Sequence, residues 1–424
     1  MTEKHPRILY DWIPEVERLD RYEPGGYHPI MIGDVLQNRY HIVDKLGHGG
    51  YSTVWLVQDT QKSRYVALKI NTASAPPREA KALSALSAPS THPGREAIPS
   101  FLDEFEVEGP NGRHTCYTSS LAACHLRDIS FSRLFPLDVS RALIYRLAQA
   151  VEYVHSKGYV HGDIHLNNIL AKLPVKFHEL SVVELYKKYG DPETVPVTRQ
   201  DGEPLPPNAP EKAVVPLFLG KYAEEFLLAD ACLLLSDFGE AFSPALEPRL
   251  GKDCHIPPAF RAPETDNEPE VPFAYPSDIW SLATAIWEII GMQALFTTEC
   301  IPAEQIRAQQ FDVLGPLPSD WWWRWDGRKV FFNDDGSSTD SYRLDKWRTL
   351  DESFEHGIRG FRQKKGDKIT DEEKGAFLDL MRRMLAFRPG DRMTSTEVLN
   401  SEWMVKWALP DYERSLKETS VSVT

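Results

Sequence analysis

The sequence contains few cysteines, no long apolar run and no excess of positive charge. Its five cysteines are scattered along the chain: Cys116, Cys124, Cys232, Cys254 and Cys300. Because none forms a C-x-x-C pair, we expect reduced thiols rather than disulfides or a zinc site, and a cytoplasmic or nuclear location. No apolar run reaches the length that a bilayer requires, and the N-terminus lacks the apolar core of a secretory signal. We therefore expect neither secretion nor membrane insertion.

The charge balance is acidic, with 62 Asp and Glu residues against 48 Lys and Arg residues and a net charge of −14. Such a chain is repelled by phosphate backbones, so we expect no direct contact with nucleic acid and a bias toward basic partners. The 424 residues, 42% of them hydrophobic, are enough for two or three domain-sized units.

One stretch, VHGDIHLNNIL at residues 160–170, combines an acid and an amide at a spacing that suits phosphoryl transfer. Asp163 is predicted to accept the proton of an attacking hydroxyl, and Asn168, five residues later, to bind a metal ion. The motif alone is weak, because H-x-D followed by Asn also opens loops of small-molecule phosphotransferases. The flanking sequence is therefore needed to distinguish between these kinds of phosphotransferase.

Two β-branched and aromatic runs between residues 40 and 59 are joined by glycines and predict a hairpin. Glycines at its tip allow backbone N–H groups to approach phosphate oxygens. Serine replaces the third glycine of a G-x-G-x-x-G pattern, and such a motif alone is more often an ordinary hairpin. The predicted nucleotide contacts of this hairpin are Leu46, Gly47, Gly49, Ser52 and Val54.

The next predicted strand, YVALKI at residues 65–70, carries Lys69 within the order V-A-x-K. After a glycine-rich hairpin, such a lysine is expected to reach nucleotide phosphates and to pair with a helix glutamate. The helix expected after Pro77 offers Glu79. Ala67 and Ser119, the latter on a strand predicted at 115–121, complete the expected nucleotide site.

Asp237 follows Asn168 by 69 residues, an unusually long separation. The segment between them holds seven prolines from Asp191 to Pro216. This composition predicts a linker, and we assign residues 173–228 as an insertion. The apolar run CLLLS is followed by D-F-G, in which Asp237 is expected to be a second ligand of the metal ion.

Three further signatures follow in chain order. An A-P-E at 262–264 precedes an apolar helix, expected over 277–291, in which Asp278 should hold the backbone of the 160–170 loop and Trp280 should pack beneath. Arg392 is the expected buried partner of Glu264. The tryptophans at 321, 322, 323 and 325 are expected to pack onto their own domain rather than grip a partner.

In this order the motifs resemble those of eukaryotic protein kinases over residues 33–409. The stretch GGYHPIMIGDVLQNRYHIVDKLG, followed by S-T-V-W-L, resembles the SR-protein kinases, especially their fungal group, which also carry an insertion before the D-F-G position. The resemblance implies an α+β, two-lobed protein kinase fold. It places a small antiparallel β-rich N-lobe at 33–121 and a larger helical C-lobe at 122–409, between an N-terminal extension (1–32) and a C-terminal tail (410–424).

The resemblance also implies an ATP- and Mg²⁺-dependent serine/threonine protein kinase, whose best-known relatives phosphorylate arginine/serine-rich splicing factors. Lys69 and Glu79 would position phosphates, Asp163 would orient the hydroxyl, and Asn168 and Asp237 would bind metal. We expect a monomer that acts on a basic, arginine/serine-rich protein, although the segment after Gly291 lacks a dense acidic run for docking such repeats.

Two substitutions depart from the family pattern. Gly162 replaces the arginine that answers a phosphate on the activation segment, and residues 240–262 offer only Ser243 as an acceptor, so we expect activity without phosphorylation there. His165 replaces a lysine and is a weaker donor to the γ-phosphate. Because this loop also resembles those of aminoglycoside and choline kinases, a small-molecule phosphotransferase and a pseudokinase scaffold remain alternatives.

Overall fold

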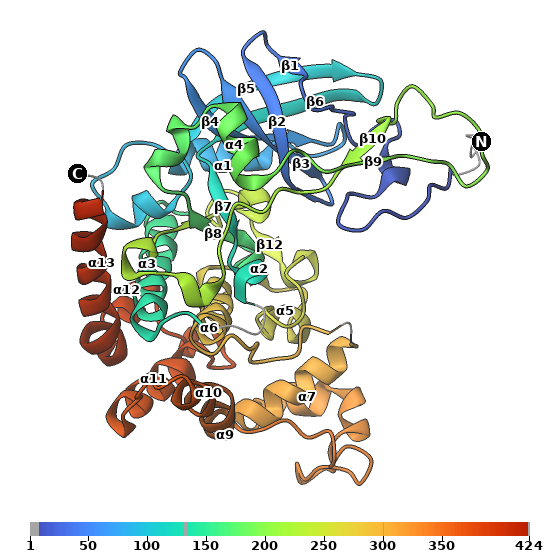
Figure 1. The fold of residues 1–424 in the computed structure, drawn as a ribbon. Coiled ribbons are helices and arrows are strands. Elements are labelled where there is room, and N and C mark those ends of the chain that lie inside the picture. The colour runs from blue at the N-terminus through green and yellow to red at the C-terminus, as the bar shows by residue number, and fades with distance from the viewer. Residues whose placement is uncertain (1–7, 131–133, 300, 423–424) are drawn as a thin grey trace. The chain divides into compact units, whose positions relative to one another are not determined.

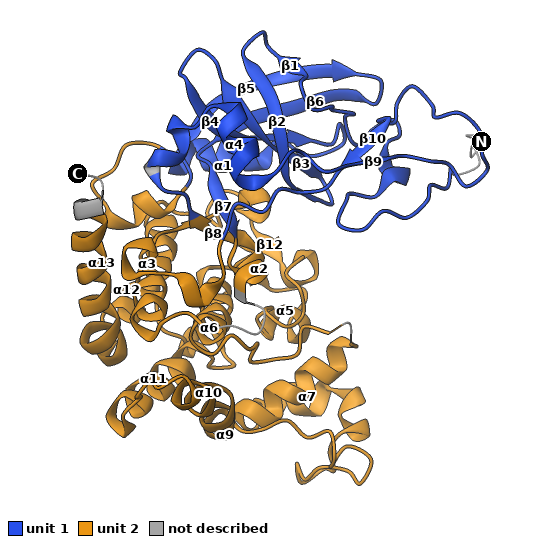
Figure 2. Cartoon of the chain, viewed as in Figure 1, with its two compact units in different colours: residues 1–87, 99–124, 172–220 blue, residues 88–98, 125–171, 221–424 orange. Residues whose placement is uncertain are grey.

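The computed structural model describes residues 8–130, 134–299 and 301–422. It divides into two compact units, which Figure 2 distinguishes by colour. Unit 1 comprises residues 1–87, 99–124 and 172–220, and unit 2 comprises residues 88–98, 125–171 and 221–424. Within the described ranges, no helix is both long and apolar enough to cross a membrane. Cys116, Cys124, Cys232 and Cys254, the cysteines among the described residues, form no disulfide, and Cys300 lies outside the described residues.

Unit 1 is built on a six-stranded antiparallel sheet with the spatial order β1-β2-β3-β4-β6-β5 (Figure 1). The strands are β1 (Val35–Leu36), β2 (Tyr40–Gly49), β3 (Ser52–Asp59), β4 (Arg64–Asn71), β5 (Phe101–Gly109) and β6 (Gly112–Ser119). The short strand β7 (Ala122–His125) follows. Helix α1 (Arg78–Leu86) comes after β4 and begins at the predicted Pro77, which occupies its N-cap position.

Both faces of this sheet are apolar. In β3 and β4, apolar side chains occur at consecutive positions and therefore point to both sides of the sheet. Trp55, Val57 and Leu68 belong to one core cluster. Leu56 and Tyr65, which point to the other side by strand alternation, belong to a second cluster. Such two-sided burial requires covering layers on both faces.

The insertion supplies part of that cover, so the linker prediction for this segment is wrong. The segment forms α4 (Val182–Tyr189) and an antiparallel hairpin of β9 (Thr194–Pro196) and β10 (Lys212–Val214). Phe177, Leu185 and Leu219 are buried in the second cluster, and the hydroxyl of Tyr186 donates a 2.9 Å hydrogen bond to the carbonyl of Val43. The structure therefore groups residues 172–220 with the sheet of unit 1, because docked apolar side chains stabilise a short helix that could not fold alone.

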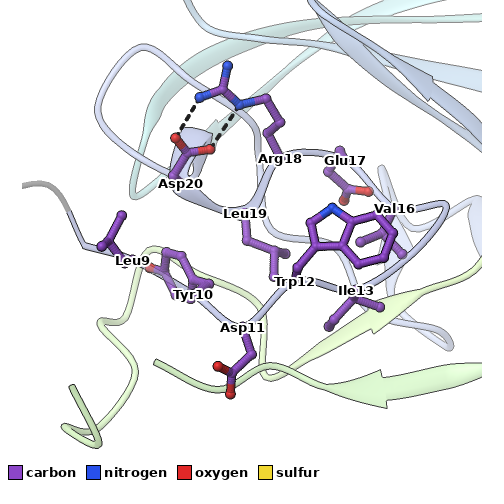
Figure 3. Close-up of a pocket in the computed structure, with 10 residues that line it drawn as sticks. All are labelled: Leu9, Tyr10, Asp11, Trp12, Ile13, Val16, Glu17, Arg18, Leu19 and Asp20. Carbon is purple, nitrogen blue, oxygen red and sulfur yellow. Dashed lines mark hydrogen bonds and ion pairs between the residues drawn. The ribbon is translucent and has the colours of Figure 1, made fainter. Parts of the chain in front are cut away.

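The N-terminal extension shares a small core with the β9–β10 hairpin. Leu19, Tyr22 and Tyr27 are buried in one apolar cluster with Val197 and Ala213. Ten residues between positions 9 and 20, among them Leu19 of this cluster, line a pocket of about 290 Å³ (Figure 3). None of the predicted site residues lines this pocket.

Unit 2 is mainly helical (Figure 1). Its helices are α2 (Leu126–Ser130), α3 (Leu137–Ser156), α5 (Glu264–Asn267), α6 (Tyr275–Gly291), α7 (Ala303–Leu314), α8 (Ser319–Arg324), α9 (Leu350–Ser353), α10 (Gly360–Lys364), α11 (Asp371–Met384), α12 (Ser395–Leu399) and α13 (Leu409–Ser422). Its short strands are β8 (Ile169–Lys172), β11 (Leu233–Leu235), β12 (Arg249–Leu250) and β13 (Pro272–Phe273). Helix α6 is buried on all sides from Ser277 to Gly291, as its nearly continuous apolar sequence requires.

The tryptophans of the WWWRW run pack largely onto unit 2, as predicted. Trp321, Trp322 and Trp325 are buried in a cluster with Phe332 and Tyr342. Trp323 is the exception, with 59% of its surface exposed.

Candidate active site

The glycine-rich hairpin is formed by β2 and β3 in unit 1. Its register pairs Gly49 with Ser52 and Gly47 with Val54. A Cβ atom on Gly47 or Gly49 would meet nothing within 4 Å, so the backbone at the tip is accessible to a bound group. Open space beside the backbone is what a hairpin needs to approach a phosphate closely.

The other predicted nucleotide contacts lie on the adjacent strands. Val54 pairs with Lys69, and Ala67 pairs with Ser119 on β6. Because side chains alternate along strands, these four side chains share one face of the sheet. Leu46 and Ala67 also border the apolar cluster to which the insertion contributes, so the insertion packs beside this end of the predicted site.

Lys69 and Glu79 form the predicted ion pair. The Nζ atom of Lys69 lies 2.7 Å from the carboxylate of Glu79, and their side chains are 15% and 9% exposed. The pair links β4 to the first turn of α1. The lysine side chain is thereby held on the same face as Val54.

Asp163, His165 and Asn168 lie together in the loop of unit 2 that precedes β8. The amide nitrogen of Asn168 donates 2.9 Å hydrogen bonds to the backbone carbonyl and to Oδ2 of Asp163. The Nε2 atom of His165 lies 3.2 Å from Oδ1 of Asp163, and its ring stacks on Phe260. Oδ1 itself is buried and has no hydrogen-bond partner among the described residues.

Asp278 of α6 holds this loop, as predicted. Its carboxylate accepts hydrogen bonds from the backbone N–H groups of His161, at 2.7 Å, and Gly162, at 2.9 Å. Nε2 of His155 lies 2.9 Å from the same carboxylate. Burial alone raises the pKa of a carboxyl group, but the hydrogen bonds and the two histidines outweigh it and keep the pKa of Asp278 below its ordinary value. An ionised, fully buried Asp278 fixes the backbone leading into Asp163.

His161 is a positioning residue that the sequence analysis did not single out. Its Nε2 atom lies 3.0 Å from the carbonyl of Ser236, and its Nδ1 atom accepts a 3.2 Å hydrogen bond from the backbone N–H of Asp163. Burial lowers the pKa of His161, and a neutral ring with Nε2–H as donor satisfies both contacts. The ring also packs on Phe238, so it connects the 160–170 loop to the D-F-G segment. The H-x-D pattern was the available signal.

Asp237 and Asn168 are brought together by the pairing of two short strands. β11 pairs with β8, and the backbone N–H of Ser236 donates a 2.8 Å hydrogen bond to the carbonyl of Asn168. Asp237 has a left-handed backbone, with φ of 59°, and an exposed side chain. Left-handed non-glycine residues cluster at functional sites.

Glu264 and Arg392 form the predicted buried pair. Two nitrogens of the guanidinium donate to the two carboxylate oxygens, at 2.8 and 2.6 Å. The guanidinium also lies 5.1 Å over the ring of Trp280, which is fully buried. These contacts tie the A-P-E segment to α6.

Comparison with known proteins also finds similarity to protein kinases. A protein kinase domain family matches residues 40–200. A serine/threonine protein kinase of Aspergillus fumigatus is 26% identical over 404 residues, which are 92% of this chain and 91% of that protein. SRSF protein kinase 3 of Homo sapiens is 36% identical over 160 residues, which are 35% of this chain and 28% of that protein.

The chain is a protein serine/threonine kinase, similar to the SR-protein kinases. It has the two-lobed protein kinase fold. A solved crystal structure of a kinase domain superposes with a TM-score of 0.63, covering 89% of this chain and 98% of that one at 18% identity. In this kinase Lys69 and Glu79 lie in unit 1, whereas Asp163, Asn168 and Asp237 lie in unit 2.

A protein kinase domain implies ATP and a divalent metal ion, and the residues of this kinase fit such an ion. Carboxylate and amide oxygens are hard ligands, and Asp237 and Asn168 supply one of each. The amide nitrogen of Asn168 is used toward Asp163, so its oxygen is the atom suited to a cation. Within the described part of the chain no three His, Cys, Asp or Glu residues cluster as metal ligands. Two protein ligands suffice where nucleotide phosphates complete the shell.

Proposed function

We propose that this kinase transfers the γ-phosphoryl group of Mg²⁺-bound ATP to serine or threonine hydroxyls of a basic, arginine/serine-rich protein. The observation that carries the proposal is the carboxylate of Asp163 on a loop that Asp278 fixes. Asn168 donates to its Oδ2, and its Oδ1 accepts no hydrogen bond and has His165 at 3.2 Å. A carboxylate oxygen in this state is prepared to accept a hydrogen bond from an attacking hydroxyl.

Each residue of the site has a separate role in the proposed phosphoryl transfer. Lys69, oriented by Glu79, positions the phosphates, and the hairpin contacts Leu46, Gly47, Gly49, Ser52 and Val54, with Ala67 and Ser119, bind the nucleotide. Asn168 and Asp237 would hold Mg²⁺, which when bound would supply positive charge beside the phosphates. The substrate oxygen bonds to the γ-phosphorus as the bond to the β,γ-bridging oxygen breaks, and Asp163 takes the hydroxyl proton. His165 orients Asp163 and replaces the usual lysine.

We also propose that this activity needs no phosphate on the activation segment. The guanidinium of Arg249 donates 2.8 and 2.9 Å hydrogen bonds to the carbonyl and the carboxylate of Glu240, and the Arg249 side chain is 7% exposed. A partly buried ion pair within the segment supports the order that a phosphate–arginine contact supplies elsewhere. The acidic net charge and the reduced thiols further support a monomer in the cytoplasm or nucleus that binds basic protein and no nucleic acid.

A substrate panel tests the proposal. Purified protein, labelled ATP and Mg²⁺ are incubated with an arginine/serine peptide, a generic basic protein, choline and an aminoglycoside. We expect label on the serine peptide, and no label on a copy with every serine replaced by alanine. Label only on a small molecule would assign the chain to the small-molecule phosphotransferases. No transfer to any acceptor would favour a pseudokinase scaffold.

A further inference from the structure

The N-terminal extension touches the tip of the glycine-rich hairpin. The hydroxyl of Tyr27 donates a 2.7 Å hydrogen bond to the carbonyl of Gly49. The guanidinium of Arg21 donates to the carbonyl of Gly50 and lies 5.7 Å over the ring of Tyr51. Three consecutive residues of the tip are thus held by two side chains, and all five residues belong to unit 1.

Arg21 is itself held in place. Its guanidinium lies 5.2 Å over the ring of Tyr27, so it is contacted by aromatic rings from the extension and from the hairpin. Such cation–π contacts favour one orientation of an otherwise flexible side chain. Farther back, the carbonyl of Glu15 lies 3.3 Å from Nε2 of His48, which extends the contact along β2.

The extension is anchored to parts of unit 1 other than the hairpin. The carbonyls of Gly25 and Gly26 accept hydrogen bonds from the N–H groups of Ser74, at 2.9 Å, and Ala73, at 3.1 Å, after β4. The side chain of Asn111, in the turn between β5 and β6, donates a 2.7 Å hydrogen bond to the backbone carbonyl of Tyr27. Because its anchors lie at the ends of other strands, the extension can fix the tip relative to the rest of the sheet.

We propose that residues 15–27 form a clamp that orders the glycine-rich hairpin before nucleotide binds, with Tyr27 and Arg21 as positioning residues. The proposal rests on the proposed use of ATP at this hairpin. A glycine-rich tip loses much backbone freedom when it closes over phosphates, and a clamp already present in the free enzyme removes part of that cost. The clamp therefore acts on ATP affinity rather than on the chemical step.

Two variants test the clamp. Tyr27→Phe removes one hydroxyl and keeps the ring, whereas Arg21→Ala removes the hydrogen bond and both ring contacts. We expect each to raise KM for ATP by about fivefold, the worth of one ordinary hydrogen bond, with kcat within about twofold of wild type. Arg21→Lys, which retains a donor, should recover most of the loss.

Tyr40→Phe is the matched control. Its hydroxyl donates a 2.6 Å hydrogen bond to Asp103 near the beginning of β2, at the opposite end of the strand from the tip. Like Tyr27→Phe, it deletes one phenolic hydroxyl from a buried ring of unit 1. It should leave KM for ATP unchanged, because it touches no part of the clamp.

A second measurement needs no ATP. Hydrogen–deuterium exchange of the peptide spanning residues 47–52 should be faster in Tyr27→Phe and Arg21→Ala than in wild type, and unchanged in Tyr40→Phe. Equal exchange and equal KM in the clamp variants would overturn the inference, as would a lowered kcat at constant KM. If wild-type protein transfers no phosphate, the proposed function fails, whereas the exchange experiment still decides whether the clamp orders the tip.

Discussion

A Cβ atom on Gly162 would lie 2.8 Å from the carbonyl oxygen of Glu240. Gly162 also has a left-handed backbone, with φ of 76°. Both features favour glycine, because a side chain would add backbone strain and a steric clash. The residue that replaces the family's arginine is thus fitted to its surroundings, and the loop before Asp163 approaches the activation segment more closely than a side chain allows.

The first prediction follows from this contact. Gly162→Ala should lower the free energy of unfolding by about 3 kcal/mol, from backbone strain plus overpacking. Gly158→Ala is the control, because Gly158 has a similar φ of 79° but nothing within 4 Å of a Cβ. It should cost only about 1 kcal/mol. Denaturant unfolding of both variants measures the difference, and equal losses would show that the approach to Glu240 does not matter.

The second prediction concerns regulation. Phosphatase-treated wild-type protein should keep its full rate, because Glu240 rather than a phosphate pairs with Arg249. Glu240→Gln should lower kcat by about tenfold, since it leaves the buried guanidinium with only the more distant carboxylate of Glu247, 3.8 Å away, as counter-charge. Glu270→Gln, which breaks an exposed pair with Lys252, is the control and should change kcat by less than about twofold. Loss of activity on dephosphorylation, restored by phosphate on Ser243, would refute constitutive activity.

The third prediction tests whether the insertion is part of the fold. Leu185 of α4 is fully buried, whereas Val183 on the same helix is 76% exposed. Leu185→Ala should lower the free energy of unfolding by about 2–4 kcal/mol through the cavity it leaves, and Val183→Ala by less than about 0.5 kcal/mol. Thermal and denaturant unfolding provide the comparison. If both variants match wild type, the insertion behaves as a linker after all.

The fourth prediction is a pH dependence carried by two buried groups of unit 1 with opposite signs. Burial, with a smaller contribution from His114, lowers the pKa of His28 to about 4. Between pH 6.5 and 4 the unfolded chain therefore binds a proton that the folded chain does not, and His28 makes stability fall as pH falls. Burial raises the pKa of Asp44 to about 6. Between pH 3.8 and 6 the folded chain keeps a proton that the unfolded chain has released, so Asp44 makes stability fall as pH rises.

Replacing one of these groups separates them. Asp44→Asn should raise the free energy of unfolding above pH 6 by about 1–3 kcal/mol, because the buried charge is gone. Below pH 6 the variant should lose stability on acidification more steeply than wild type, since the opposing contribution of Asp44 is gone. Urea unfolding at pH 4.5 and 7.5 provides the comparison. A variant less stable than wild type at the higher pH would mean that Asp44 is stabilised in its charged form.

Much of the site was predictable because its residues occur in motifs of fixed spacing. The Lys69–Glu79 and Glu264–Arg392 pairs and the hold of Asp278 on the 160–170 loop are found where the sequence analysis placed them. Each depends on a few charged side chains in a known chain order. The nucleotide and metal roles of these residues remain predictions.

The parts that were not predicted depend on long-range packing. Leu185 and Leu219 are separated by a proline-rich stretch and form no periodic pattern, so their burial depends on a sheet formed more than a hundred residues earlier. The contact of Tyr27 with Gly49 involves a hydroxyl and a backbone carbonyl, which leave no signature in sequence. Local periodicity detects neither kind of contact.

The most direct test of the central claim is the initial rate of phosphoryl transfer from ATP to an arginine/serine peptide, measured for wild type and Asp163→Asn. Loss of the general base should reduce the rate by at least about a hundredfold while ATP binding persists. Equal rates for the two proteins, or label transferred only to choline or an aminoglycoside, would contradict the account.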